Sequence, residues 1–142
     1  MQTSKDYLAS LLKITQLGQV SIRSVLDSTM RPGLRTLLKD QLLEYDALEA
    51  EVHSLAAQRG WEMRDMDPAK RFMTDRLIRL KLSGRNYDSE IASLMIQGTT
   101  KNMIQSLKNS RQYPVEDEGL QILARKLIDC ETAAIQQMRA FL

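Results

Sequence analysis

Five polar residues lie where the helical periodicity of the sequence would otherwise place apolar side chains. Each is near the middle of a predicted helix and on the side expected to face its neighbours; the five are Gln19, Gln41, Tyr45, Thr99 and Glu131. We expect their amide, phenol, hydroxyl and carboxyl groups to form one polar layer across a bundle. An ionised carboxylate among aliphatic side chains is very costly, so Glu131 must be hydrogen-bonded, paired, protonated or at the edge of its stripe. Gln19, Gln41 and Tyr45 are its expected partners.

Two interpretations of this polar layer remain open. In the first, a satisfied hydrogen-bond network fixes the register of the helices, and the general rule that buried polar groups are satisfied favours it. In the second, the same residues, joined by Asp129, hold a metal ion or a small ligand. One carboxylate with neutral amides does not hold two metal ions, because such a centre needs several anionic oxygens or imidazoles. The favoured interpretation therefore predicts no metal and no cofactor.

Other residues with reactive side chains are isolated in the sequence. His53 is the sole histidine and follows Glu49 at helical spacing, which indicates a partly exposed helix residue paired with a carboxylate. Cys130 has no evident cationic neighbour that would lower its pKa, so we expect an inert thiol. The sequence contains no glycine-rich phosphate loop, nucleophile elbow or paired-carboxylate spacing. We therefore predict no catalytic residue and a protein that is not an enzyme.

The elements that must position these residues are long helices, because apolar residues recur every three or four positions and no alternating strand pattern is found. The predicted ranges are about 4–26, 32–58, 88–108 and 116–142. The helix over 88–108 should be the most buried, since its first half is apolar on nearly all faces. Residues 61–87 form a long crossover with a short helix of its own, beginning at Asp67 and Pro68. The predicted fold class is an all-α, antiparallel four-helix bundle in a single domain, residues 1–142.

The crossover combines basic and apolar residues. It contains Lys70, Arg71, Arg76, Arg79, Lys81 and Arg85 beside Phe72, Met73, Leu77 and Leu80. Such a helix can bind an anionic membrane or a nucleic acid backbone. The sequence favours instead a helix that packs its apolar side on the bundle and solvates its basic side. Just before it, Trp61, Met63 and Met66 form an apolar cluster, which is either a contact surface for a homodimer or a cap on the bundle end.

Composition narrows the function classes. The chain of 142 residues is 43% apolar, enough for the core of one domain, and its net charge of +2 argues against a nucleic acid partner. A single cysteine excludes an intramolecular disulfide and favours a reducing compartment. We expect a cytoplasmic protein, because the first residues lack a leader pattern and no stretch reaches the roughly 18 apolar residues of a membrane span.

Three segments carry a family pattern: LLKDQLLEYDALEAEVHSLAAQRGW at 37–61, SEIASLMIQGTTKNMIQSLK at 89–108 and LARKLIDCETAAIQQMRAFL at 123–142. Together they resemble the ferritin-like superfamily of four-helix bundles, in particular its small bacterial, rubrerythrin-like and spore-coat-like members. Metal-binding members use a lone Glu on two helices and Glu-x-x-His on the other two. That signature is absent here, since the residue three before His53 is Ala50, and only Glu131 matches a ligand position. The resemblance therefore implies the fold with a degenerate metal site.

These observations predict a small non-enzymatic bundle with a structural or protein-interaction role in a bacterial cytoplasm. The expected partner is a protein, either a second copy or another chain, and the resemblance admits a spore-associated role. The alternative is a ferritin-like protein that binds a metal ion or small ligand at the mid-bundle polar layer.

Overall fold

The computed structural model describes residues 3–28, 30–82, 88–112 and 116–142. Over these residues the chain is helical and contains no strand. The elements are α1 (Ser4–Leu26), α2 (Pro32–Arg59), α3 (Pro68–Lys81), α4 (Asp88–Gln112) and α5 (Glu118–Met138), followed by a short 3-10 helix, η1 (Arg139–Phe141). No helix in this described part is long and apolar enough to cross a membrane.

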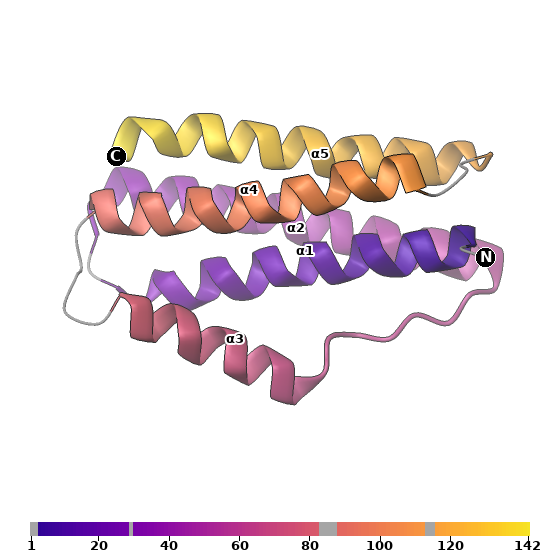
Figure 1. The fold of residues 1–142 in the computed structure, drawn as a ribbon, viewed down its shortest axis with the longest axis horizontal. Coiled ribbons are helices and arrows are strands. Elements are labelled where there is room, and N and C mark those ends of the chain that lie inside the picture. Colours follow the sequence, from indigo (N-terminus) through magenta and orange to yellow (C-terminus); the bar gives the residue numbers. More distant parts are fainter. Residues whose placement is uncertain (1–2, 29, 83–87, 113–115) are drawn as a thin grey trace.

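Four of the helices, α1, α2, α4 and α5, lie side by side as a bundle, and α3 lies outside it against α1 (Figure 1). The helices α1 and α5 run in one direction and α2 and α4 in the other (Figure 1). The chain therefore returns along the bundle between α2 and α4, and α3 forms part of this crossover. The predicted all-α bundle with a helix-containing crossover is confirmed.

The helix ends follow from local sequence. Thr3 and Asp6 form a capping box, in which the Asp6 backbone N–H donates to Thr3 Oγ1 at 3.2 Å and the Thr3 N–H donates to Asp6 Oδ2 at 3.1 Å. Asp67 caps α3 by accepting from the Ala69 N–H at 2.9 Å. One predicted end is wrong, because α4 continues past Lys108 to Gln112. Asn109 is buried and accepts from Gln105 Nε2 at 2.9 Å, so this polar run is satisfied within the helix.

Gly60 ends α2 in the left-handed conformation, with φ of 70°. A Cβ at this position would meet no atom within 4 Å, so the cost of a side chain there is conformational rather than steric. We expect Gly60→Ala to lower the free energy of unfolding by about 1 kcal/mol, measured by urea denaturation. Gly60→Asn should cost less, because asparagine tolerates this region better. Equal stability of the alanine variant and the unmodified protein would contradict the assignment.

The centre of the core is α1, not α4 as the sequence predicted. Thirteen residues of α1 are buried, against five of α4. The reason is position: α1 packs against α2, α3 and α4, whereas α4 exposes Ile104 and Leu107 to solvent at 48% and 44%. The predicted stripe is therefore wrong at Leu107, and the second half of α4 buries Ser106 and Asn109 instead.

The predicted packing of the crossover helix is also wrong, because α3 has no buried residue. Its inward side instead carries Asp75, which accepts from the Ser24 hydroxyl at 2.7 Å. Arg79 bonds both Asp75, at 2.9 Å, and Asp27, at 2.8 Å. Ile78 packs against the hydrophobic core on the same side, so an apolar contact and polar contacts together set which side of α3 faces the bundle. Arg85 lies outside the described residues.

The predicted contact cluster lies along the chain between α2 and α3. Trp61 and Met63 are half-buried and pack against the hydrophobic core. Met66 is also half-buried, and its backbone N–H donates to Gln16 Oε1 at 2.7 Å. All three side chains therefore lie partly against the bundle, and the homodimer remains a prediction.

Candidate functional site

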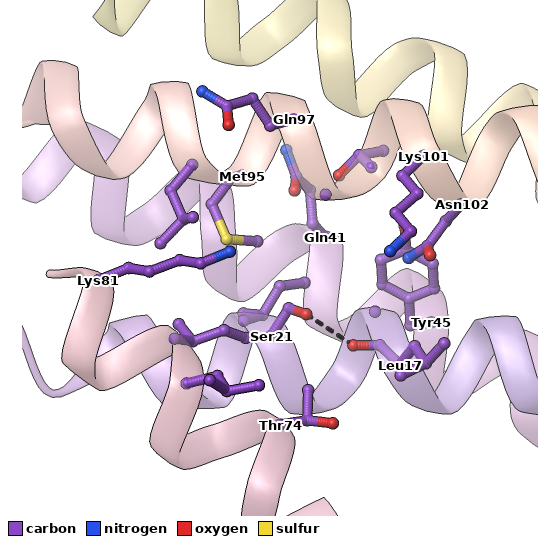
Figure 2. Close-up of a pocket in the computed structure, with 17 residues that line it drawn as sticks. Leu17, Ser21, Gln41, Tyr45, Thr74, Lys81, Met95, Gln97, Lys101 and Asn102 are labelled. Atoms are coloured by element: carbon purple, nitrogen blue, oxygen red, sulfur yellow. Dashed lines mark hydrogen bonds between the residues drawn. The ribbon is translucent and has the colours of Figure 1, made fainter.

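A pocket with a volume of about 540 Å³ lies between α1, α2, α3 and α4. Three of the five predicted layer residues, Gln41, Tyr45 and Thr99, line it; Gln19 and Glu131 do not. Figure 2 shows Gln41 extending from α2 toward α4, whereas the Tyr45 ring packs on Gly18 of α1. Apolar side chains form much of the wall: Leu17, Ile22, Leu77, Ile78, Leu94 and Met95.

Gln41 is the buried polar group of this pocket. Its side chain is only 3% exposed, and its Nε2 has no hydrogen-bond partner among the described residues. An unpaired buried amide donor costs about 1–3 kcal/mol, so a native site normally supplies an acceptor for it. The Gln41 amide is therefore the group in this pocket most in need of a ligand oxygen.

Two lysines bring positive charge to the same space. Lys81, at the end of α3, and Lys101, on α4, both direct their side chains toward the pocket interior (Figure 2). Hydroxyl and amide groups of Ser21, Thr74 and Asn102 add hydrogen-bonding capacity. None of the described lining residues is acidic. Both lysines are also exposed to solvent, and the described lining holds no carboxylate to pair with them.

Tyr45 closes the pocket on the side of α1 and α2. It is 3% exposed, and its ring packs so closely on Gly18 that a Cβ there would lie 2.8 Å from Tyr45 Cζ. Burial raises the pKa of the Tyr45 phenol, and the nearby Cys130, Glu131 and Glu44 raise it further. The phenol is consequently a neutral group at physiological pH.

Glu131 is fully buried, but between α4 and α5 and away from the pocket lining. Its Oε1 accepts from the Ser106 hydroxyl at 2.8 Å, and its Oε2 has no partner among the described residues. Burial raises the pKa of Glu131 to about 7, while the Ser106 hydrogen bond opposes the shift. The hydrogen-bond partner is therefore Ser106, which the sequence analysis missed. Its position two helical turns after Thr99 was the available signal.

Gln19 belongs to a different contact. It is 2% exposed, and its Nε2 donates to Asp46 Oδ1 at 2.9 Å, with Arg23 placed 3.5 Å from the same oxygen. The five predicted residues thus do not form one hydrogen-bonded network among the described residues, although Glu131 lies near Tyr45. Three line the pocket, one bonds across α1 and α2, and one bonds across α4 and α5. Asp129 is exposed and lines no part of this pocket.

Cys130 is buried beside Glu44. Its Sγ lies 3.3 Å from Glu44 Oε2, and burial together with this carboxylate raises the thiol pKa to about 12. The thiol is therefore protonated at neutral pH, in agreement with the expected inert cysteine.

One group of potential metal ligands converges elsewhere in the described structure. The ligand atoms of Glu49, His53 and Asp65 lie within 4.8 Å of one another, with His53 Nε2 at 3.7 Å from Asp65 Oδ1. His53 and Asp65 are exposed, and Gln16 Nε2 already donates to Glu49 at 3.0 Å and Asp65 at 2.9 Å. The predicted pairing of His53 with a carboxylate is present, but this surface group is separate from the pocket.

The two-metal centre implied by the ferritin-like resemblance does not fit the residues present. Glu131 has one unpaired buried oxygen, yet its hydrogen-bond partner is a serine and its neighbours Tyr45 and Cys130 are held neutral. Two cations need several anionic oxygens or imidazoles, and the sole histidine is on the surface with Asp65.

No protein-family model, curated protein or solved structure matches this chain.

Proposed function

We propose that this protein is a non-enzymatic helical bundle that binds a small amphipathic anion in the pocket between α1, α2, α3 and α4. The observation that carries the proposal is the combination of a buried, unpaired Gln41 amide with two inward-directed lysines and no acidic lining residue. Hydrogen-bond donors and positive charge both favour an anionic oxygen, such as that of a carboxylate or phosphate.

The remainder of the ligand should be apolar. Six lining side chains are aliphatic or thioether groups, and a volume of about 540 Å³ falls in the range typical of small-molecule sites, roughly 300–1,000 Å³. An acyl or alkyl chain would contact these walls while its charged head lies near Lys81 or Lys101. A fatty carboxylate has both features.

A binding role without catalysis is supported by the state of the reactive groups. Cys130 and Glu131 do not line the pocket, and the pKa of each is raised, so neither presents an activated nucleophile to a bound ligand. The Tyr45 phenol lines the pocket but is kept neutral by burial. These groups can hold a molecule in place but lack a base positioned beside a nucleophile.

We also propose that the fold is a ferritin-like bundle that lacks a two-metal centre. The parallel course of α2 and α4, joined by a crossover that contains α3, supports this relationship (Figure 1). A second candidate function, the interaction role expected from the sequence, is supported by one observation: the exposed apolar side chains of α3.

The pocket is tested with decanoate as the probe, using calorimetric titration and the midpoint of thermal unfolding. Decanoate should bind and raise the melting temperature, because a ligand specific for the folded state stabilises it. Decanol should bind at least about fivefold more weakly, since it lacks the charge that interacts with the lysines. Acetate, which has the charge but no chain, should give no shift.

Substitutions localise the site. Lys81→Gln and Lys101→Gln together should weaken decanoate binding about tenfold, whereas Lys39→Gln, the same change on α2 outside the pocket lining, should leave it unchanged. Tight binding of decanol and decanoate alike would reject the anion, and equal loss in the Lys39 variant would reject this pocket.

A further inference from the structure

The outer face of α3 exposes four large apolar side chains. Phe72, Met73, Leu77 and Leu80 are 64%, 64%, 56% and 71% exposed. Met73 and Leu80 lie farthest from the contact of Asp75 with Ser24, Phe72 lies at its edge, and Leu77 also lines the pocket between the helices. The packing of Ile78 on the core and the polar contacts of Asp75 and Arg79 thus leave most of this apolar surface exposed.

Basic residues flank this face, although Arg79 pairs with Asp27 and Lys81 lines the pocket. The segment Pro68–Lys81 contains five basic residues and one acidic residue, and this Asp75 is turned toward α1. Lys70 and Arg76 are exposed and form no ion pair with any described residue. Lys13 of α1 lies beside Lys70 and lowers the pKa of Lys70, chiefly through a side-chain hydrogen bond, with smaller effects from burial and from the like charge.

Arg76 extends over the ring of Phe72, with its guanidinium carbon 5.9 Å from the ring centroid. This cation–π contact places a charged end at the edge of an apolar surface. Basic side chains at a membrane surface adopt this arrangement, because their stems cover apolar groups while their charged ends reach lipid phosphates.

We infer that the outer face of α3 binds the surface of an anionic lipid membrane. Phe72, Met73 and Leu80 enter the boundary between head groups and acyl chains, and Lys70 and Arg76 contact the lipid phosphates. An amphipathic helix that lies in the membrane plane needs both an apolar face and flanking basic residues, and α3 presents both. This inference goes beyond the pocket and does not depend on its ligand.

The combination of charged and apolar side chains favours a membrane over a second copy of the chain or a nucleic acid. Pairing with α3 of a second copy would cover the apolar side chains but would place two basic faces together without an acidic partner. A nucleic acid would satisfy the charges but leave most of the apolar side chains without a partner. An anionic bilayer provides negative charge and an apolar interior at the same surface.

The experiment is co-sedimentation of the full chain with phosphatidylcholine vesicles that do or do not contain phosphatidylglycerol. We expect binding to the vesicles with phosphatidylglycerol, little binding to phosphatidylcholine alone, and a steep decrease as salt is raised, because salt screens exposed charges. Duplex DNA under the same low-salt conditions should bind more weakly than the anionic vesicles.

Variants are chosen outside the pocket lining so that the two sites are tested separately. Phe72→Ser with Leu80→Ser should reduce vesicle affinity more than tenfold, since two large apolar side chains no longer enter the interface. Arg76→Gln should reduce it about fivefold. The matched controls are Leu43→Ser, an equally exposed leucine on α2, and Arg125→Gln on α5; both should bind as the unmodified protein does. Far-ultraviolet circular dichroism checks that each variant is folded.

Four results would overturn the inference. Binding that ignores phosphatidylglycerol, or that falls equally in the Leu43 control, would show that α3 does not recognise an anionic surface. Preferential binding of DNA would indicate that the partner of α3 is a polyanion and not a membrane. A dimer that dissociates in the Phe72 and Leu80 variant, with no vesicle binding, would assign the face to a second copy. Decanoate binding should survive in the Phe72 and Leu80 variant. Conversely, the lysine variants should lose decanoate affinity while they keep the exposed side chains of Phe72 and Leu80.

Discussion

Tyr45→Ala is expected to lower the free energy of unfolding by about 3–5 kcal/mol, the usual cost of removing a large buried aromatic ring. The ring is 3% exposed and fills the space opposite Gly18, where no side chain of α1 can replace it. Urea denaturation at a single pH measures the change. A loss below about 1 kcal/mol would mean that the neighbouring helices collapse into the space.

The reciprocal change tests the same contact. Gly18→Leu should cost about 1–3 kcal/mol, because its Cβ alone would lie 2.8 Å from Tyr45 Cζ. In the Tyr45→Ala background this cost should largely disappear, so that the two changes combine to less than their sum. Gly98→Ala is the control, since a Cβ there meets nothing within 4 Å and alanine favours the helix by about 1 kcal/mol. Strict additivity of the Gly18 and Tyr45 changes would contradict the packing.

Stability should fall by roughly 3 kcal/mol between about pH 5 and pH 8 because of Glu131. The folded pKa of Glu131 is raised to about 7 from an ordinary value of 4.5, so the folded chain holds a proton that the unfolded chain has released. The stability is therefore greatest below the unfolded pKa and is lost as pH rises through the folded pKa. Asp117, whose pKa is lowered to about 2 by Arg59, affects only more acidic conditions.

The variant Glu131→Gln should remove this slope, because an amide does not titrate while its oxygen still accepts from Ser106. Asp129→Asn, the same change at an exposed residue of α5, should keep the slope. Denaturation curves for the three proteins at several pH values give the comparison. A flat profile for the unmodified protein would show that the Glu131 carboxylate is ionised at little cost, and hence solvated.

Local sequence determined the helices well. Thr3, Gly60 and Asp67 are recognised from the sequence alone because capping depends on residues only a few positions away. The orientation of α3 was not recognisable, since it depends on the contact of Asp75 with Ser24, far apart in the chain. Apolar periodicity indicates that a helix has an apolar face but does not identify what covers it.

The candidate site was predicted only in part, because its composition also depends on contacts between residues far apart in the chain. Gln41, Tyr45 and Thr99 do meet, because α2 and α4 bring their middle turns to one pocket. Glu131 was expected to bond the amides and phenol of α1 and α2, but its partner is Ser106 of α4. Lys81 comes from α3, whose position beside α1 no sequence pattern specified. The sequence thus predicts which face of a helix is apolar, but it does not predict which other helix packs against that face.

Leu77 has two surfaces, since it lines the pocket and also belongs to the exposed face of α3. A molecule in the pocket and a bilayer on the outside would therefore both act on the position of one helix. If decanoate strengthens the attachment of the protein to vesicles, thermodynamic reciprocity requires the attached protein to hold decanoate more tightly by the same factor. The membrane would then regulate ligand binding in the pocket, and the ligand would regulate attachment to the membrane.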